Sequence, residues 1–103
     1  MLECLQEILN KRFDPEAAKG FQAIYQLNIR DESEYQLTIN DGAWHLQQGQ
    51  AQYPDIRLTM TKATFDALIA GELDAMTAYF TGKIKSRGDL HLAKRLKSLF
   101  GKQ

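Results

Sequence analysis

The sequence predicts a single α+β domain over residues 1–103, with helices packed on one face of a mostly antiparallel sheet. The period of the hydrophobic residues changes from 3.6 to two near Phe21 and returns to 3.6 after Thr61. The strand-like segments therefore follow one another, and most of the helix-like segments come after them, an order typical of α+β domains. A chain of 103 residues, 44% of them hydrophobic, is long enough for one buried core.

Leucine, isoleucine and phenylalanine recur at helical spacing from Leu2 to Phe13 and predict an amphipathic helix over the first dozen residues. Asp14-Pro15-Glu16 then predicts a capped, acidic turn that runs to Lys19 and ends at Gly20. Arg12 lies inside the apolar arc of the first helix. Its guanidinium could meet a ligand carboxylate or extend along the surface into water, and the sequence leaves both open.

Four segments with alternating hydrophobic residues follow, and each predicts a strand: 21–29, 35–39, 44–46 and 56–60. Asp31-Glu32-Ser33 separates the first two. Asn40-Asp41-Gly42 predicts a hairpin turn, because these residue types tolerate the positive φ angles that tight turns require. The polar stretch from Gln47 to Pro54 predicts a loop.

The helical period returns after Thr61, a residue type that often caps a helix N-terminus. Three apolar stripes predict three helices, with Phe65, Leu68 and Ile69 in the first, Ala75, Met76, Tyr79 and Phe80 in the second, and Leu92, Ala93, Leu96, Leu99 and Phe100 in the third. Gly71 and Gly82 end the first two, and Asp74 and Asp89 cap the last two. Residues 83–87 predict a short fifth strand around Ile84, followed by a turn at Gly88.

Side chains that could carry catalysis or bind a metal are few and scattered. The chain has one cysteine, Cys4, and two histidines, His45 and His91, which fall in separate predicted elements. No motif for hydrolysis, phosphate binding or dinucleotide binding occurs. One cysteine and two distant histidines do not make a usual zinc site. We therefore expect no enzyme activity, no metal and no cofactor.

The charges are divided along the chain. Residues 1–82 hold six Lys and Arg against twelve Asp and Glu, whereas residues 83–103 hold seven against Asp89 alone. This basic C-terminal segment favours contact with an anionic membrane or an acidic partner protein. A solvated helix face beside a charged strand explains the same pattern. The neutral net charge and the lack of a basic, aromatic-rich sheet motif argue against nucleic-acid binding.

Several motifs together resemble the sterol carrier protein type 2 domain. They are the segment 54–60 with its Pro54-Asp55 start, a helix from Phe65 that ends at Gly71, a Gly-Lys-Ile-x-x-x-Gly-Asp run over 82–89, and a leucine-rich last helix. The resemblance covers essentially the whole chain and is clearest from Tyr53 to Phe100. It implies a five-stranded sheet covered on one face by helices, with a hydrophobic tunnel between them.

The resemblance also implies a ligand: a fatty acid, fatty acyl-CoA, sterol-like or isoprenoid molecule that is bound, and transferred, without chemistry. Carried onto this sequence, the tunnel lining would be Trp44, Leu46, Leu58, Phe65, Leu68, Ile69, Met76, Tyr79, Phe80, Ile84, Leu92, Leu96 and Phe100.

We expect a compact, cytoplasmic, bacterial-type member of that family, because neither a secretion signal nor a peroxisomal tripeptide is visible. An alternative role is an accessory protein that presents lipid-like intermediates, such as ubiquinone precursors, to enzymes or to a membrane. A third hypothesis is that the protein has no cavity and acts only as an interaction domain.

Overall fold

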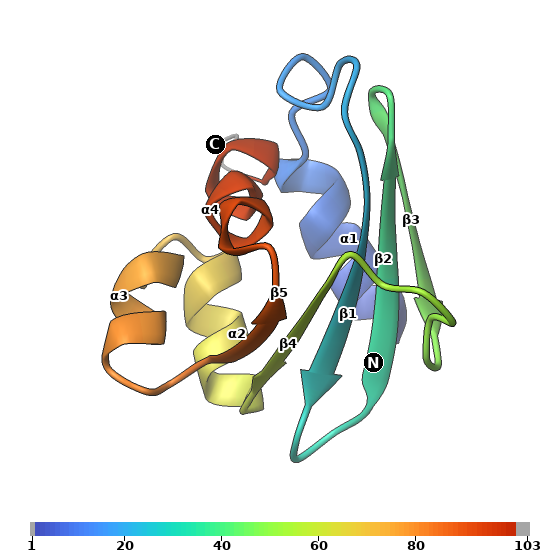
Figure 1. The fold of residues 1–103 in the computed structure, drawn as a ribbon. Helices are drawn as coiled ribbons and strands as arrows, with labels where there is room; N and C mark the ends of the chain where they lie inside the picture. Colours follow the sequence, from blue (N-terminus) through green and yellow to red (C-terminus); the bar gives the residue numbers. More distant parts are fainter. Residues whose placement is uncertain (1, 101–103) are drawn as a thin grey trace.

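A computed structural model describes residues 2–100, with the side chains of residues 2–5 and 97 left out. It has two layers, a five-stranded sheet and helices on one of its faces (Figure 1). The side chains of Leu2, Cys4 and Leu5 therefore lie outside the described part. The elements are, in order, α1 (Leu2–Arg12), β1 (Gln22–Ile29), β2 (Glu34–Asn40), β3 (Ala43–Gln48), β4 (Ile56–Met60), α2 (Lys62–Ile69), α3 (Ala75–Phe80), β5 (Lys85–Gly88) and α4 (Leu90–Leu99).

The strand order across the sheet is β3-β2-β1-β4-β5. Three of the four neighbouring pairs are antiparallel, which confirms the predicted mostly antiparallel sheet. The exception is β4, which lies parallel to β1 with Leu27 opposite Leu58. Alternating hydrophobic residues do not specify strand direction, so this parallel pair was not predicted.

Local signals located most of the turns and caps correctly. Asp41 and Gly42 adopt φ of 42° and 86°, which confirms a tight hairpin turn between β2 and β3. Thr61 caps α2, where its side-chain oxygen accepts a hydrogen bond from the Thr64 amide at 3.3 Å. Asp74 and Asp89 cap α3 and α4 in the same way.

The fifth strand, β5, begins at Lys85, two residues after the predicted start, and it ends at Gly88, one residue after the predicted end. Ile84 is buried but precedes β5, because the amides of Lys83 and Ile84 both donate to the Ala78 carbonyl and complete the turn after α3. Gly88 is paired with Ile56 as the last residue of β5 and is not part of a turn.

The chain crosses the far face of the sheet between β3 and β4, in the loop of residues 49–55. Gln26, in the middle of β1, points to this face and is fully buried beneath the loop. Its side-chain oxygen accepts a hydrogen bond from the Ala51 amide at 2.7 Å, and its Nε2 donates to the Gly49 carbonyl at 3.2 Å. Asp55 then accepts a hydrogen bond from the Ile24 amide at 2.7 Å. These bonds hold the loop in place and align β4 with β1.

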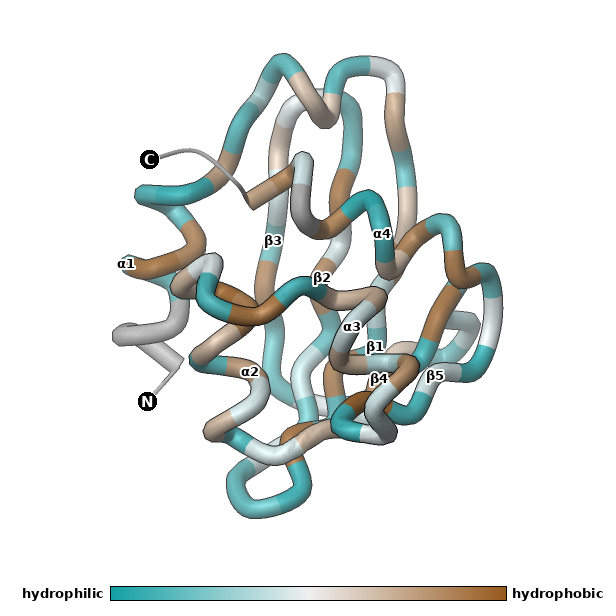
Figure 2. Tube along the Cα trace, turned by 90° about the vertical axis from the view of Figure 1, so that its left-hand side faces the viewer, coloured by the Kyte–Doolittle hydropathy of each residue, from teal (hydrophilic) through white to brown (hydrophobic). Residues whose placement is uncertain are grey.

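The core lies between the sheet and the helices. Alternate residues of β1, β2 and β4 point toward the helices and are buried, among them Tyr25, Leu37 and Leu58. Figure 2 shows this alternation of hydrophobic and hydrophilic residues along the chain. Leu9 of α1 and Leu99 of α4 close the core from the helical side.

Gly88 gives a test of how closely β5 approaches the chain beside it. A Cβ at this position would lie 2.6 Å from the Asp55 carbonyl oxygen, and its φ is 118°. Gly49 has nearly the same φ, 119°, but a Cβ there would meet nothing within 4 Å. We expect Gly49→Ala to lower the free energy of unfolding by about 1–2 kcal/mol through backbone strain alone. Gly88→Ala should lower the free energy of unfolding by about 2 kcal/mol more than Gly49→Ala does, because the added methyl group would also collide with the Asp55 carbonyl. Urea unfolding of both variants tests this, and equal losses would contradict it.

Candidate functional site

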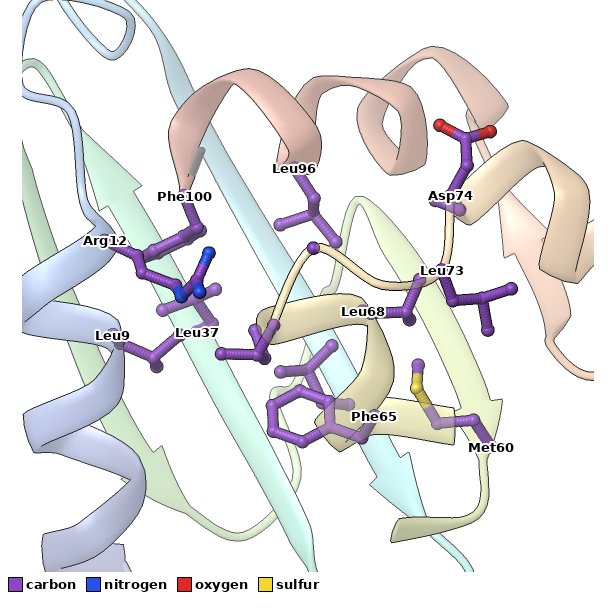
Figure 3. A pocket seen from close by; sticks show the side chains of 14 residues that line it. Leu9, Arg12, Leu37, Met60, Phe65, Leu68, Leu73, Asp74, Leu96 and Phe100 are labelled. Carbon is purple, nitrogen blue, oxygen red and sulfur yellow. The ribbon is translucent and has the colours of Figure 1, made fainter. Parts of the chain in front are cut away.

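A pocket lies between the sheet and helices α1, α2 and α4, and the first residue of α3 borders it as well (Figure 3). We call it the inner pocket, and its volume is about 230 Å³. Its wall is formed by Leu9, Arg12, Leu27, Leu37, Met60, Phe65, Leu68, Ile69, Gly71, Leu73, Asp74, Ala75, Leu96 and Phe100. Arg12 and Asp74 are the two charged side chains in that wall, and the rest is almost entirely apolar.

Short helices and tight ends create this space. Helix α2 is eight residues long and α3 is six. Between them Gly71 adopts a φ of 78°, which reverses the chain over the pocket. The segment from Gly71 to Ala75 therefore borders the pocket as loop and helix start.

Arg12 is the cation of the inner pocket. It belongs to the last turn of α1, where a positive charge is favoured by the helix dipole. Its Nη2 donates to the Ala70 carbonyl, the C-cap of α2, at 3.2 Å. A guanidinium has five N–H donors in a planar fork, so this one bond leaves most of its donor capacity for other acceptors. Figure 3 shows the Arg12 side chain among the residues of the pocket wall.

A second, larger pocket of about 550 Å³ adjoins the first on the other side of Arg12. We call it the outer pocket. Both pockets share Arg12, Phe65 and Ile69, so these three side chains form the partition between them. The wall of the outer pocket contains four further charged side chains, Lys11, Glu32, Lys62 and Asp66, beside Ile8, Ile29, Tyr35 and Ala70. The Lys62 ammonium and the Asp66 carboxylate form a salt bridge of 2.9 Å there.

Aromatic rings close the end of the inner pocket near Phe100. The rings of Phe13 and Phe100 are 5.4 Å apart, and the Trp44 ring lies 6.5 Å from each of them. These spacings are typical of tilted and edge-to-face aromatic pairs. The cluster links the end of α4 to β3, and it keeps the Phe100 ring in the pocket wall.

The structure brings five of the thirteen predicted lining residues to the inner pocket: Phe65, Leu68, Ile69, Leu96 and Phe100. They come from α2 and from the end of α4. Phe65 and Ile69 border the outer pocket as well.

The other eight predicted residues lie outside the walls of both pockets. Leu46, Leu58 and Ile84 are buried in the core, and Trp44 packs against Phe100 of the pocket wall. Met76, Tyr79 and Leu92 are half-buried, and Phe80 is 77% exposed at the end of α3.

Helix α1, the inward face of the sheet and the turn after α2 supply the wall residues absent from the predicted lining, among them Leu9, Leu37, Met60 and Leu73. Their spacing already marked Leu9, Leu37 and Met60 as core-facing. No signal in the sequence separates an inward residue that packs fully from one that borders a gap. For Arg12, the sequence predicts either contact with a ligand carboxylate or extension into water, and it does not predict a partition between two pockets.

Two further observations concern the residues that the structure describes. Among them, no three His, Cys, Asp or Glu side chains are placed to hold a metal ion. No described helix is long and apolar enough to cross a membrane.

The family model of the SCP-2 sterol transfer family matches residues 5–101 of this chain. Human stomatin-like protein 1 is 28% identical over 100 residues, which are 96% of this chain and 25% of that protein. The chain therefore spans about a quarter of this relative.

Several solved structures share this fold. A sec-alkylsulfatase, Pisa1 from Pseudomonas sp., has a TM-score of 0.82 and 27% identity, covering 98% of this chain and 16% of its own. Palmitated SCP2L2 from Aedes aegypti has a TM-score of 0.69 and 24% identity over 93% of this chain and 89% of its own. The ubiquinone synthesis protein UbiJ-SCP2 has a TM-score of 0.70 and 12% identity, with coverages of 97% and 90%.

Tyr25 holds α4, one wall of the inner pocket, against the sheet. Its hydroxyl donates to the Leu92 carbonyl at 2.7 Å. Burial raises the pKa of Tyr25 well above its ordinary value, and the nearby Arg95 offsets only part of this effect. The neutral form is therefore the form that the folded protein favours.

This shift predicts a loss of stability in alkali. Because the pKa of Tyr25 is higher in the folded protein, only the unfolded chain loses this proton above about pH 10. The contribution of the neutral Tyr25 side chain to the free energy of unfolding is complete below about pH 10, and it is lost as the pH rises beyond that value. Tyr25→Phe should lower the free energy of unfolding by about 1 kcal/mol at pH 7. It should also make the fall of that free energy with rising pH less steep. Urea unfolding between pH 8 and about 11 tests it, with the exposed Tyr53→Phe as control. If the free energy of unfolding of Tyr25→Phe fell with pH as steeply as that of the wild type, the prediction would be contradicted.

Proposed function

Because the chain belongs to the SCP-2 sterol transfer family, we propose that it binds a single-chain lipid between its helices and sheet and carries that lipid without chemistry. The observation that carries the proposal is the apolar inner pocket with Arg12 at its partition. The hydrocarbon chain occupies the inner pocket, and the polar head group lies at Arg12 or beyond it, in the outer pocket. The palmitate named for the mosquito SCP2L2 structure is a ligand of this shape.

The energetics suit a carrier. Each buried methylene contributes about 0.8 kcal/mol, so a chain of about fifteen carbons contributes roughly 12 kcal/mol before other terms. Association costs roughly 4–15 kcal/mol, which leaves a modest and reversible affinity. The inner pocket, at about 230 Å³, is smaller than the range of about 300–1,000 Å³ that is usual for ligand sites. A long chain therefore needs the adjoining outer pocket as well.

Arg12 favours an anionic head group over a neutral one. A carboxylate at the partition would accept charge-assisted hydrogen bonds from the donors that the Ala70 carbonyl leaves unused. Burial of the charge is limited there, because the outer pocket carries polar side chains such as Lys11 and Glu32. Fatty acids are thus better candidates than sterols for this site.

A second candidate function is the presentation of lipid-like intermediates to a partner enzyme. The exposed cations of the basic C-terminal segment, Lys83, Lys85, Arg87 and Lys94, favour an acidic partner. UbiJ-SCP2, whose name states a role in ubiquinone synthesis, shares the fold. A pull-down that returns biosynthetic enzymes, and loses them in 0.5 M salt, would favour this role; a pull-down without them would count against it.

Leu68 is the position for testing the pocket itself, since it is half-buried in the wall of the inner pocket. Leu68→Trp should fill the space and lower the affinity for a long fluorescent acyl chain at least about tenfold, because several methylenes are displaced. Leu68→Ala enlarges the same space and should retain binding of long chains. Fluorescence titration, with circular dichroism to verify folding, measures both. Equal affinities in the wild type and Leu68→Trp, or no uptake by the wild type, would refute the proposed site.

The head-group assignment has a separate test. The wild type should bind a fatty acid more tightly than the alcohol of equal length, by about 1.5–3 kcal/mol, because hydrogen bonds to charged groups are worth that much. Arg12→Gln should weaken the acid and leave the alcohol almost unchanged. Calorimetric titrations of both ligands into both proteins provide the comparison. A parallel loss for acid and alcohol would show that Arg12 only supports the structure.

A further inference from the structure

The end of α3 carries a large hydrophobic side chain in water. Phe80 is 77% exposed, whereas Ala78, two residues earlier, is completely buried. The Tyr79 ring packs edge-on against the Phe80 ring, with the centroids 5.6 Å apart. Helix α3 ends at Phe80, Gly82 beyond its C-cap adopts a φ of 78°, and the Lys83 amide donates back to the Ala78 carbonyl at 2.8 Å. Phe80 and Lys83 therefore flank one tight turn.

The chain between the two N-cap residues Asp74 and Asp89 carries no negative charge. From Ala75 to Gly88 there is no Asp or Glu, and the three cations Lys83, Lys85 and Arg87 are all exposed. Strand β5 is an edge of the sheet. Its cross-strand neighbours add no carboxylate, because Lys85 lies opposite Thr59 and Arg87 lies opposite Arg57.

Edge strands often carry Lys or Arg to prevent pairing with other molecules, which accounts for Lys85 and Arg87. It does not account for an exposed phenylalanine beside them, which lowers solubility. Two like charges opposite each other, as at Arg57 and Arg87, are also unfavourable unless an anion is near. A hydrophobic ring next to unpaired cations is the combination that binds an anionic bilayer.

We propose that the segment of residues 79–87, which we call the α3–β5 turn, docks on the surface of an anionic lipid bilayer. The Phe80 ring enters the boundary between head groups and acyl chains, and Lys83 and Lys85 meet lipid phosphates. Figure 1 shows α3 and β5 joined at one side of the molecule. The inference does not depend on the proposed function, although α3 starts at Asp74 and Ala75, in the wall of the inner pocket. Docking would therefore bring a wall of the inner pocket to the bilayer.

Vesicle sedimentation tests the docking. The wild type should bind vesicles of phosphatidylglycerol and phosphatidylcholine, bind pure phosphatidylcholine far less, and lose binding in high salt. Phe80→Ala should weaken partitioning to anionic vesicles about fivefold to tenfold, because the ring no longer inserts. Lys83→Glu with Lys85→Glu should weaken it more than about twentyfold, since each cation near such a surface contributes about a fivefold factor.

Tyr53→Ala is the matched control. Tyr53 is 79% exposed, as Phe80 is, but it lies in the loop of residues 49–55, outside the α3–β5 turn. The Tyr53→Ala variant should bind anionic vesicles as strongly as the wild type does. With tryptophan placed at either position, bromine-labelled lipids should quench the fluorescence of Phe80→Trp and not of Tyr53→Trp.

Three results would overturn the inference: no binding of the wild type to anionic vesicles, equal losses in Phe80→Ala and Tyr53→Ala, or a loss only in the charge-reversal variant. A loss only in the charge-reversal variant would mean that the surface binds through its charges alone, as a docking site for an acidic protein would. Acyl-chain uptake is measured separately in the Leu68 variants, so failure of docking and failure of lipid binding are distinguishable.

Discussion

The burial of the Gln26 amide beneath the loop of residues 49–55 is the constraint on which the arrangement of the other elements depends. Its hydrogen bonds to Gly49 and Ala51 hold the chain as it crosses the far face of the sheet. An unpaired buried amide would be costly, so the loop and the side chain fix each other. Strand β4 then enters parallel to β1. Helices α2 to α4, which follow β4, therefore pack on the same face as α1, and the pocket lies between the two helical groups.

The pocket combines an apolar interior with a single cation at its inner partition. Arg12 serves the fold by its bond to the α2 C-cap, and it still has donors for a ligand. The same helices that bound the pocket lead to the outer surface: α3 starts in the pocket wall and ends at Phe80. Binding of a lipid and contact with a bilayer would thus use opposite ends of one six-residue helix.

Features set by neighbouring residues were predicted well, because their physics is local. The caps at Thr61, Asp74 and Asp89 satisfy amides two or three residues away, and the turn at Asp41-Gly42 needs only the positive φ of its own residues. Of the thirteen residues predicted to line the site, five border the inner pocket. A helical stripe shows which side chains face inward, but the six residues of α3 bury Ala78 and leave Phe80 in water. Which stripe residues are buried depends on the distance to the neighbouring helix.

By itself, the sequence determined the α+β class, the order of the elements, their caps and the division of charge between residues 1–82 and 83–103. Periodicity and capping chemistry are properties of short segments, so one chain suffices to read them. The tertiary structure alone decided the parallel pairing of β1 with β4, the fit of Gly88 against Asp55, and the meeting of Leu9, Arg12 and Leu37 around one cavity. These depend on contacts between residues far apart in the chain, which no periodicity encodes.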